Sequence, residues 1–116
     1  MTVKEFYDAA GGGYEVMASK FPSDATITAF LGIFKRDKSF ESLKKLLAEG
    51  DTQGSFAAAH TLKGVVLNLN LEGLAKPVCN IVEALRAGNI SAARTLFPEV
   101  ETAYNKAIAA LNEFLP

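Results

Sequence analysis

Apolar residues recur at helical spacing along nearly the whole chain, and glycine and proline interrupt the pattern at intervals. One set follows the i, i+3, i+4, i+7 spacing of a helix face: Ile27, Phe30, Leu31 and Phe34. Sustained alternation of apolar and polar residues, which is typical of a half-buried strand, does not occur. The sequence therefore predicts an all-α protein.

Local signals divide the chain into two short helices followed by longer ones. Thr2 and Glu5 have the spacing of a capping box, and the Gly11-Gly12-Gly13 run is expected to end the first helix near Ala10. The further expected segments are Tyr14 to about Lys20, Ser23 to a break near Asp37–Ser39, a helix from there to Gly50, Thr52 to Leu69, a helix ending at Gly88, and a last one capped by Asn89 or Ser91. Together they predict an antiparallel four-helix bundle with short additional N-terminal helices.

Three positions within this pattern concern helix geometry. Asn70 stands where a helix end needs a positive φ angle, which asparagine tolerates better than most residues. Pro77 implies either a helix that begins near Lys76 or a bent first turn from Glu72. Pro98 similarly indicates a kink or a restart in the last segment.

Length and composition restrict the classes of function. The 116 residues suit one domain, residues 1–116, and 49% hydrophobic residues can form a core without a metal or a disulfide. Twelve Lys and Arg against 13 Asp and Glu argue against a basic nucleic-acid binder. The single Cys excludes a multi-cysteine zinc site, and the single His excludes a metal site that needs two imidazoles. No apolar run approaches the ~18 residues of a membrane span and no signal-peptide core is present, so we expect a soluble, cytoplasmic protein. We also expect a monomer that binds no nucleic acid, membrane or metal.

The only histidine, His60, lies in the segment from Thr52 to Leu69. At about 100° per residue, Leu62 and Leu69 fall opposite His60, so the imidazole is expected to point away from the core. Within about 60° of it on the same wheel lie Gln53, Phe56, Lys63, Gly64 and Leu67.

Several of these neighbours are unusual for a solvated helix face. Gly64 stands mid-helix, where glycine costs about 1 kcal/mol relative to alanine. Phe56 and Leu67 place large apolar groups there. A bare position beside an imidazole lets a partner's backbone or a phosphoryl group approach, and Lys63 supplies a positive charge one turn away.

Each feature also has a purely structural explanation. The histidine and the lysine could be solvated side chains, Gly64 could serve close helix packing, and Phe56 with Leu67 could form a homodimer seam. Cys79, beside Val78 and Val82, is expected to be a small buried hydrophobe. Because His60, its lysine and glycine neighbours and the two large apolar residues converge on one patch, the pattern favours a functional surface.

The stretch Ala58-Ala59-His60-Thr61-Leu62-Lys63-Gly64 resembles the phosphoacceptor motif A-H-x-L-K-G of histidine-containing phosphotransfer (Hpt) domains. The resemblance extends to Gly50-Asp51 before the motif and to the helix ending Ala84-Leu85-Arg86-Ala87-Gly88-Asn89 after it. Val65-Val66, Asn70 and Pro77 depart from the usual family pattern without touching the acceptor histidine.

The resemblance implies a four-helix bundle that carries phosphoryl groups in a multistep two-component phosphorelay. His60 would be the phosphoacceptor, Lys63 the phosphate neighbour and Gly64 the clearance residue. Gln53, Phe56 and Leu67 would contribute to the docking surface for receivers. The implied partners are receiver domains of response regulators and a hybrid histidine kinase.

The resemblance implies a carrier rather than an enzyme, because no ATP site is present and Mg²⁺ belongs to the receiver domain, so this chain needs no cofactor. Two alternatives stay open. One is a degenerate Hpt-like module that binds receivers without phosphotransfer. The other is an unrelated helical oligomerisation domain that uses Phe56 and Leu67 as its seam.

Overall fold

The computed structural model describes residues 1–116 as seven α-helices without a strand, which confirms the all-α prediction. In chain order the helices are α1 (Val3–Ala10), α2 (Tyr14–Lys20), α3 (Asp24–Arg36), α4 (Ser39–Glu49), α5 (Thr52–Asn68), α6 (Glu72–Arg86) and α7 (Ile90–Phe114). The expected break between α3 and α4 lies at Asp37 and Lys38, and Asn89 rather than Ser91 caps α7.

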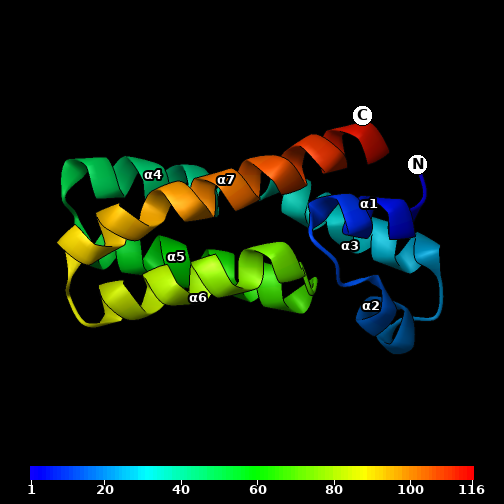
Figure 1. Cartoon of the computed structure of the whole chain (residues 1–116), viewed down its shortest axis with the longest axis horizontal. Coiled ribbons are helices and arrows are strands. Elements are labelled where there is room, and N and C mark those ends of the chain that lie inside the picture. Colours follow the sequence, from blue (N-terminus) through cyan, green and yellow to red (C-terminus); the bar gives the residue numbers. More distant parts are fainter.

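The bundle consists of α4, α5, α6 and α7, while α1, α2 and α3 gather at one end of it (Figure 1). Within the bundle α5 packs between α4 and α6, and α7 packs against α6 and α4. The long α7 continues past the bundle, so its C-terminal half also packs against α1 and α3. The predicted four-helix bundle is confirmed, and α3, with 13 residues, has the length expected for the segment that begins at Ser23.

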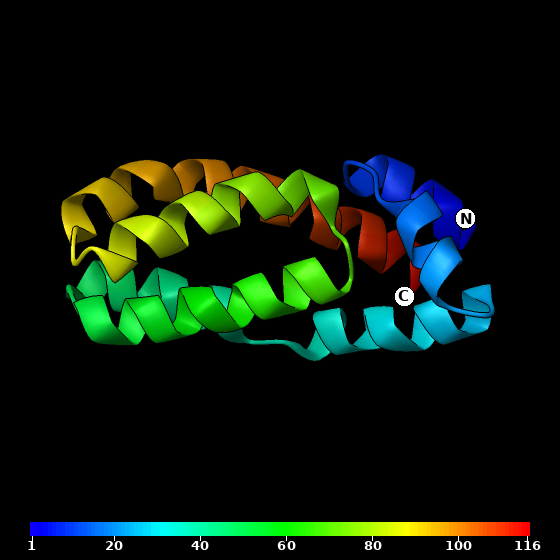
Figure 2. The same ribbon diagram turned by 90° about the horizontal axis from the view of Figure 1, so that it is seen from below.

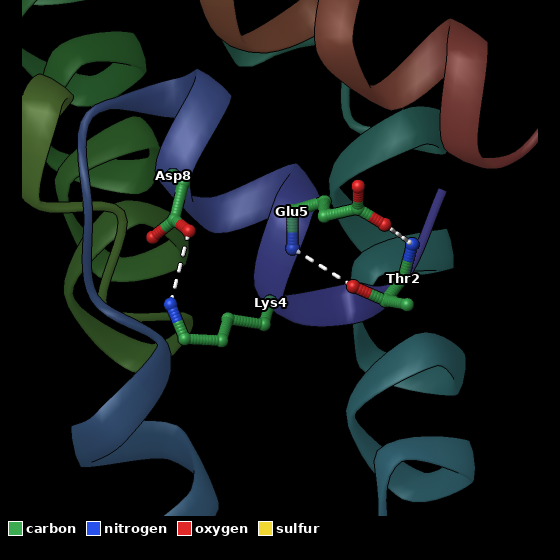
Figure 3. Close-up of polar contacts among 4 residues, drawn as sticks. All are labelled: Thr2, Lys4, Glu5 and Asp8. Atoms are coloured by element: carbon green, nitrogen blue, oxygen red, sulfur yellow. Dashed lines mark hydrogen bonds and ion pairs between the residues drawn. The ribbon is translucent and has the colours of Figure 1, made fainter.

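The first helix begins with the predicted capping box (Figure 3). The Glu5 backbone N–H donates to the Thr2 hydroxyl at 3.1 Å, and the Thr2 N–H donates to the Glu5 carboxylate at 2.8 Å. The hydrogen bond that the charged Glu5 carboxylate accepts from the Thr2 backbone N–H is the main cause that holds the pKa of Glu5 below its usual value. Lys4 and Asp8 form an i, i+4 ion pair of 3.0 Å on the same helix.

Both prolines lie inside continuous helices, which excludes a helix start near Lys76 and a restart at Pro98. The sixth helix begins at Glu72, so Pro77 stands more than one turn from its start. Pro98 lies within the 25 residues of α7. Each proline removes one backbone donor, yet packing against neighbouring helices on both sides keeps the helices intact.

Backbone contacts join the N-terminal helices to the turn between α5 and α6. Asn70 adopts the expected positive φ, 50°, and its side-chain amide donates to the Gly13 carbonyl at 3.1 Å. A Cβ at Gly73 would lie 2.5 Å from the Ala10 carbonyl oxygen, so only glycine allows α1 and α6 to approach this closely. The turn that follows α5 is therefore held from the N-terminal side.

The core runs through the bundle and into the N-terminal helices. In the bundle, the Phe40 ring of α4 stacks on Tyr104 of α7 with centroids 3.8 Å apart. At the other end Phe6 of α1 stacks on Phe114 at 6.0 Å. Cys79 is only partly buried, so the expectation of a buried small hydrophobe was wrong. It lies at the edge of the apolar face of α6, whereas Val78 and Val82 are fully buried.

Candidate functional site

The connection between α4 and α5 is held by hydrogen bonds at both of its ends. The Asp51 carboxylate accepts a hydrogen bond of 2.8 Å from the Gly54 N–H and caps the helix. Arg94 of α7 donates two hydrogen bonds, of 3.0 and 2.8 Å, to the Leu47 carbonyl at the end of α4. These contacts hold the short connection between α4 and α5, at the start of the helix that carries His60.

One face of α5 is buried in the bundle, and His60 lies on the other. The buried residues are Ser55, Ala58, Ala59, Leu62 and Val66. His60 is exposed, as the helical wheel predicts, because the apolar residues that the core needs all fall behind it. No hydrogen bond or ion pair in the structure engages the imidazole, so both ring nitrogens are free of protein partners.

The aromatic neighbour of His60 is Phe56, one turn earlier on α5. The two ring centroids lie 5.8 Å apart with a tilt of 45°. Phe56 is partly buried and packs against the core, so its ring is less exposed than the sequence suggested. It forms a firm apolar wall on one side of the imidazole.

Arg86, at the end of α6, is the functional candidate that sequence reasoning missed. Its guanidinium carbon lies 5.2 Å from the centre of the Phe56 ring, and its Nε lies 3.4 Å from the Glu83 carboxylate. The side chain is about half exposed, at 52%. In the sequence Arg86 stands out only as part of the helix ending at residues 84–89. The packing of α6 on α5 is what shows that its side chain reaches Phe56, next to His60.

Lys63 and Gly64 follow His60 by about one turn. Lys63 is partly buried and makes no hydrogen bond or ion pair within the chain, so its ammonium group is uncommitted. A Cβ at Gly64 would meet no atom within 4 Å. Close helix packing therefore does not explain this glycine, and the structural alternative considered for it is wrong.

The remaining sequence candidates extend the surface along α5. Gln53 is exposed and, with Phe56 and Arg86, lines a hollow of about 380 Å³ between the start of α5 and the end of α6. Leu67, at the other end, is 45% exposed. Gln53 and Leu67 are fourteen positions apart in the sequence, which corresponds to about 21 Å of helix. All six sequence-predicted site residues thus lie on one continuous face.

No group of three or more His, Cys, Asp or Glu side chains is arranged to hold a metal ion. None of the helices combines the length and the apolar character needed to cross a membrane.

The sequence was compared with models of known protein families, and one of them matches. The family model of the Hpt domain matches residues 37–112, well over half of the chain. The chain belongs to the Hpt domain family. The match covers the whole bundle, α4 to α7, and with it the His60 face, whereas α1 to α3 precede it. Neither the curated proteins nor the solved structures contain a significant match to the chain.

Hpt domains are phosphocarriers of phosphorelays rather than kinases, and they interact with receiver domains and histidine kinases. Membership of this family removes the alternative of an unrelated helical oligomerisation domain. The roles of individual residues in this Hpt domain stay predictions, to which the geometry described above gives a physical basis.

Proposed function

We propose that this Hpt domain accepts a phosphoryl group on His60 from the phosphorylated aspartate of one receiver domain and passes it to another. The observation that carries the proposal is the combination of an exposed, unpaired imidazole with an unpaired ammonium group and an empty position on one face of α5. A structural histidine would not need either neighbour.

The proposed transfer exchanges one bond to phosphorus for another. The lone pair of the neutral imidazole, at the outward Nε2, attacks phosphorus in line with the aspartyl oxygen. The N–P bond forms as the P–O bond breaks, and the bonding pair leaves on the receiver's carboxylate. The proton on Nδ1 stays on the ring. Transfer to the second receiver runs through the same steps in reverse, so the carrier needs no nucleotide.

Lys63 and Gly64 have separate tasks in this proposal. The ammonium group of Lys63 lies one turn from His60 and offsets the negative charge of the phosphoryl group. The empty space over Gly64 lets the receiver backbone come close enough for in-line attack. Mg²⁺ and the acidic residues that bind it belong to the receiver, so this chain contributes a nucleophile, a charge and a docking surface.

Docking involves Gln53, Phe56 and Leu67, as the sequence suggested, and Arg86 joins them. A guanidinium group beside Phe56 complements the acidic pocket that a receiver needs for its Mg²⁺. In this proposal residues 1–116 act as one monomeric domain in the cytoplasm, with receiver domains and a hybrid histidine kinase as partners. The alternative, a module that binds receivers without accepting phosphate, gives no reason for an unpaired Lys63 beside His60.

The direct test is phosphotransfer from receiver domains of the same genome. Each receiver is phosphorylated with a small-molecule donor and mixed with the full chain, and acid-labile phosphate on the chain is followed. We expect labelling by at least one receiver and none of the His60→Gln variant, which should fold normally because His60 is exposed. Binding of receivers without any labelling would favour the alternative, and labelling of the variant would exclude His60.

A further inference from the structure

The hollow of about 380 Å³ beside Phe56 lies at one end of the bundle, where the start of α5 and the end of α6 run side by side (Figure 2). Its lining residues are Thr52, Gln53, Phe56, Leu85, Arg86 and Gly88, and we call it the Arg86 hollow. The Arg86 guanidinium carbon lies 5.2 Å from the centre of the Phe56 ring, across the two helices. The hollow thus combines an aromatic surface with a positive charge.

The Arg86 hollow lies on the same side of α5 as His60. At about 100° per residue, Gln53 falls about 20° and Phe56 about 40° around the helix from His60. Residues four positions apart on a helix are surface neighbours, and the Phe56 and His60 ring centroids lie 5.8 Å apart. Thr52, eight residues before His60, is about 12 Å from it along the helix axis. A partner that is centred on His60 and buries about 800 Å² covers a disc of about 16 Å radius, which includes the hollow.

Several hydrogen-bond donors of this hollow have no partner in the protein. Arg86 contacts Glu83 through Nε alone, at 3.4 Å, and its two terminal nitrogens form no hydrogen bond. The Gln53 amide and the Thr52 hydroxyl form none either. No acidic residue belongs to the lining. The hollow therefore has a cation and free donors but no carboxylate of its own.

We propose that the Arg86 hollow binds an Asp or Glu side chain of the receiver domain that docks on His60. A carboxylate matches the hollow because a guanidinium with both terminal nitrogens free can donate two parallel hydrogen bonds to one carboxylate. Docking also removes water from the hollow, which strengthens this pair relative to an exposed ion pair. The inference rests on the proposed function and deepens it, since it names a contact outside the receiver's Mg²⁺ site that selects among receivers.

The proposal sets a requirement for the partner. Phe56 and Thr52 mark the near and far ends of the hollow, so the receiver carboxylate contacts α5 about 6–12 Å from His60 along the helix axis. A receiver with Lys or Arg at this place brings two positive charges together, which weakens its binding. The two cations of the site then have separate tasks, because Lys63 offsets the phosphoryl group and Arg86 pairs with the carboxylate.

The test measures transfer kinetics with a receiver that labels His60 in the wild-type chain. Arg86→Gln removes the charge, and Arg86→Glu reverses it with a side chain of nearly the same size. Arg36→Gln is the matched control, because Arg36 is an exposed arginine of α3 without an ion pair and its loss changes the net charge equally. Circular dichroism shows whether each variant keeps its helical content.

We expect Arg86→Gln to raise the KM for the receiver about tenfold and Arg86→Glu to raise it about 100-fold, with kcat changed less than twofold. The control should keep both constants. An unchanged KM in Arg86→Gln overturns the proposal while leaving His60 as the acceptor. Equal increases in the two Arg86 variants also overturn it, because lost packing on Phe56 would not depend on the new charge.

A second measurement identifies the receiver group. Each exposed Asp or Glu of the receiver outside its Mg²⁺ site is replaced in turn by Asn or Gln. We expect one receiver variant to raise the KM with the wild-type chain about tenfold and to leave the KM with Arg86→Gln unchanged, since the pair is already broken there. Equal effects of every receiver variant on both chains overturn the proposal. Absence of labelling in the wild-type chain contradicts the proposed function itself, and the inference falls with it.

Discussion

The Tyr7 hydroxyl donates a hydrogen bond of 2.7 Å to the Leu69 carbonyl, across 62 residues of chain. Both residues are buried, so this bond joins α1 to the end of the helix that carries His60. Leu69 also lines an apolar pocket of about 240 Å³ between α3 and the end of α5. The N-terminal helices are therefore linked to the site-bearing helix through a buried polar contact as well as through apolar packing.

Replacement of Tyr7 by phenylalanine should lower the free energy of unfolding by about 1–2 kcal/mol at neutral pH. The ring still fills its site, but the buried Leu69 carbonyl loses its donor. Urea denaturation measures the change. Tyr14→Phe is the control, since the Tyr14 hydroxyl bonds to Asp24 at an exposed position and its loss should have a smaller effect. Equal effects of the two variants would contradict this assignment.

The stability of the protein should also decline at alkaline pH because of the same residue. Burial raises the pKa of Tyr7 far above its ordinary value of 10.0. A raised folded-state pKa contributes stability that is fully present below pH 10 and is lost as the pH rises above it. Burial also raises the pKa of Tyr104, so this residue adds to the decline in stability at alkaline pH. Urea denaturation between pH 8 and pH 11 should show a shallower decline for Tyr7→Phe than for the wild type, and parallel curves would refute the prediction.

Lys63→Ala should slow transfer to His60 without loss of fold. One charge-assisted contact contributes on the order of 1.5–3 kcal/mol, which corresponds to roughly a 10- to 100-fold change in rate. Lys45→Ala on α4 is a matched control, because Lys45 is exposed and forms no ion pair. Single-turnover transfer from a phosphorylated receiver gives the rates, and equal rates for the two variants would identify Lys63 as an ordinary solvated lysine.

Gly64 and Gly73 should respond to substitution in opposite ways. Gly64→Ala should stabilise α5 by up to about 1 kcal/mol, since its new Cβ meets nothing. Gly64→Gln should fold at least as well as the wild type yet lose receiver-dependent labelling. Gly73→Ala should melt at a lower temperature, because its Cβ would lie 2.5 Å from the Ala10 carbonyl oxygen. Melting curves and a transfer assay on the same samples test both. Normal transfer by a stable Gly64→Gln variant would move the docking face elsewhere.

Ser55→Ala should leave the protein as stable as the wild type or stabilise it by about 1 kcal/mol. The Ser55 hydroxyl is fully buried in the bundle and has no hydrogen-bond partner. Alanine removes this unsatisfied group and has the higher helix propensity. Thermal unfolding measures the outcome, while transfer should be unaffected because Ser55 faces away from His60. Clear destabilisation would mean that the hydroxyl has a partner after all.

Local sequence determined most of the helices and the orientation of His60. The capping box of Thr2 and Glu5, the glycine at position 50 and the positive φ of Asn70 depend on neighbours within a few residues, and the structure shows all three. The outward direction of His60 follows from helix periodicity alone, because the core can cover only one face of α5.

Contacts between distant segments decided the rest. Sequence could not tell whether Pro77 and Pro98 break their helices, since the answer depends on the packing of α6 and α7 on their neighbours. Arg86 reaches the site only because α6 lies against α5, and the apolar pocket exists only because α3 meets the end of α5. Periodicity reports which face of a helix is buried, whereas the side chains that meet across two helices are set by how those helices pack.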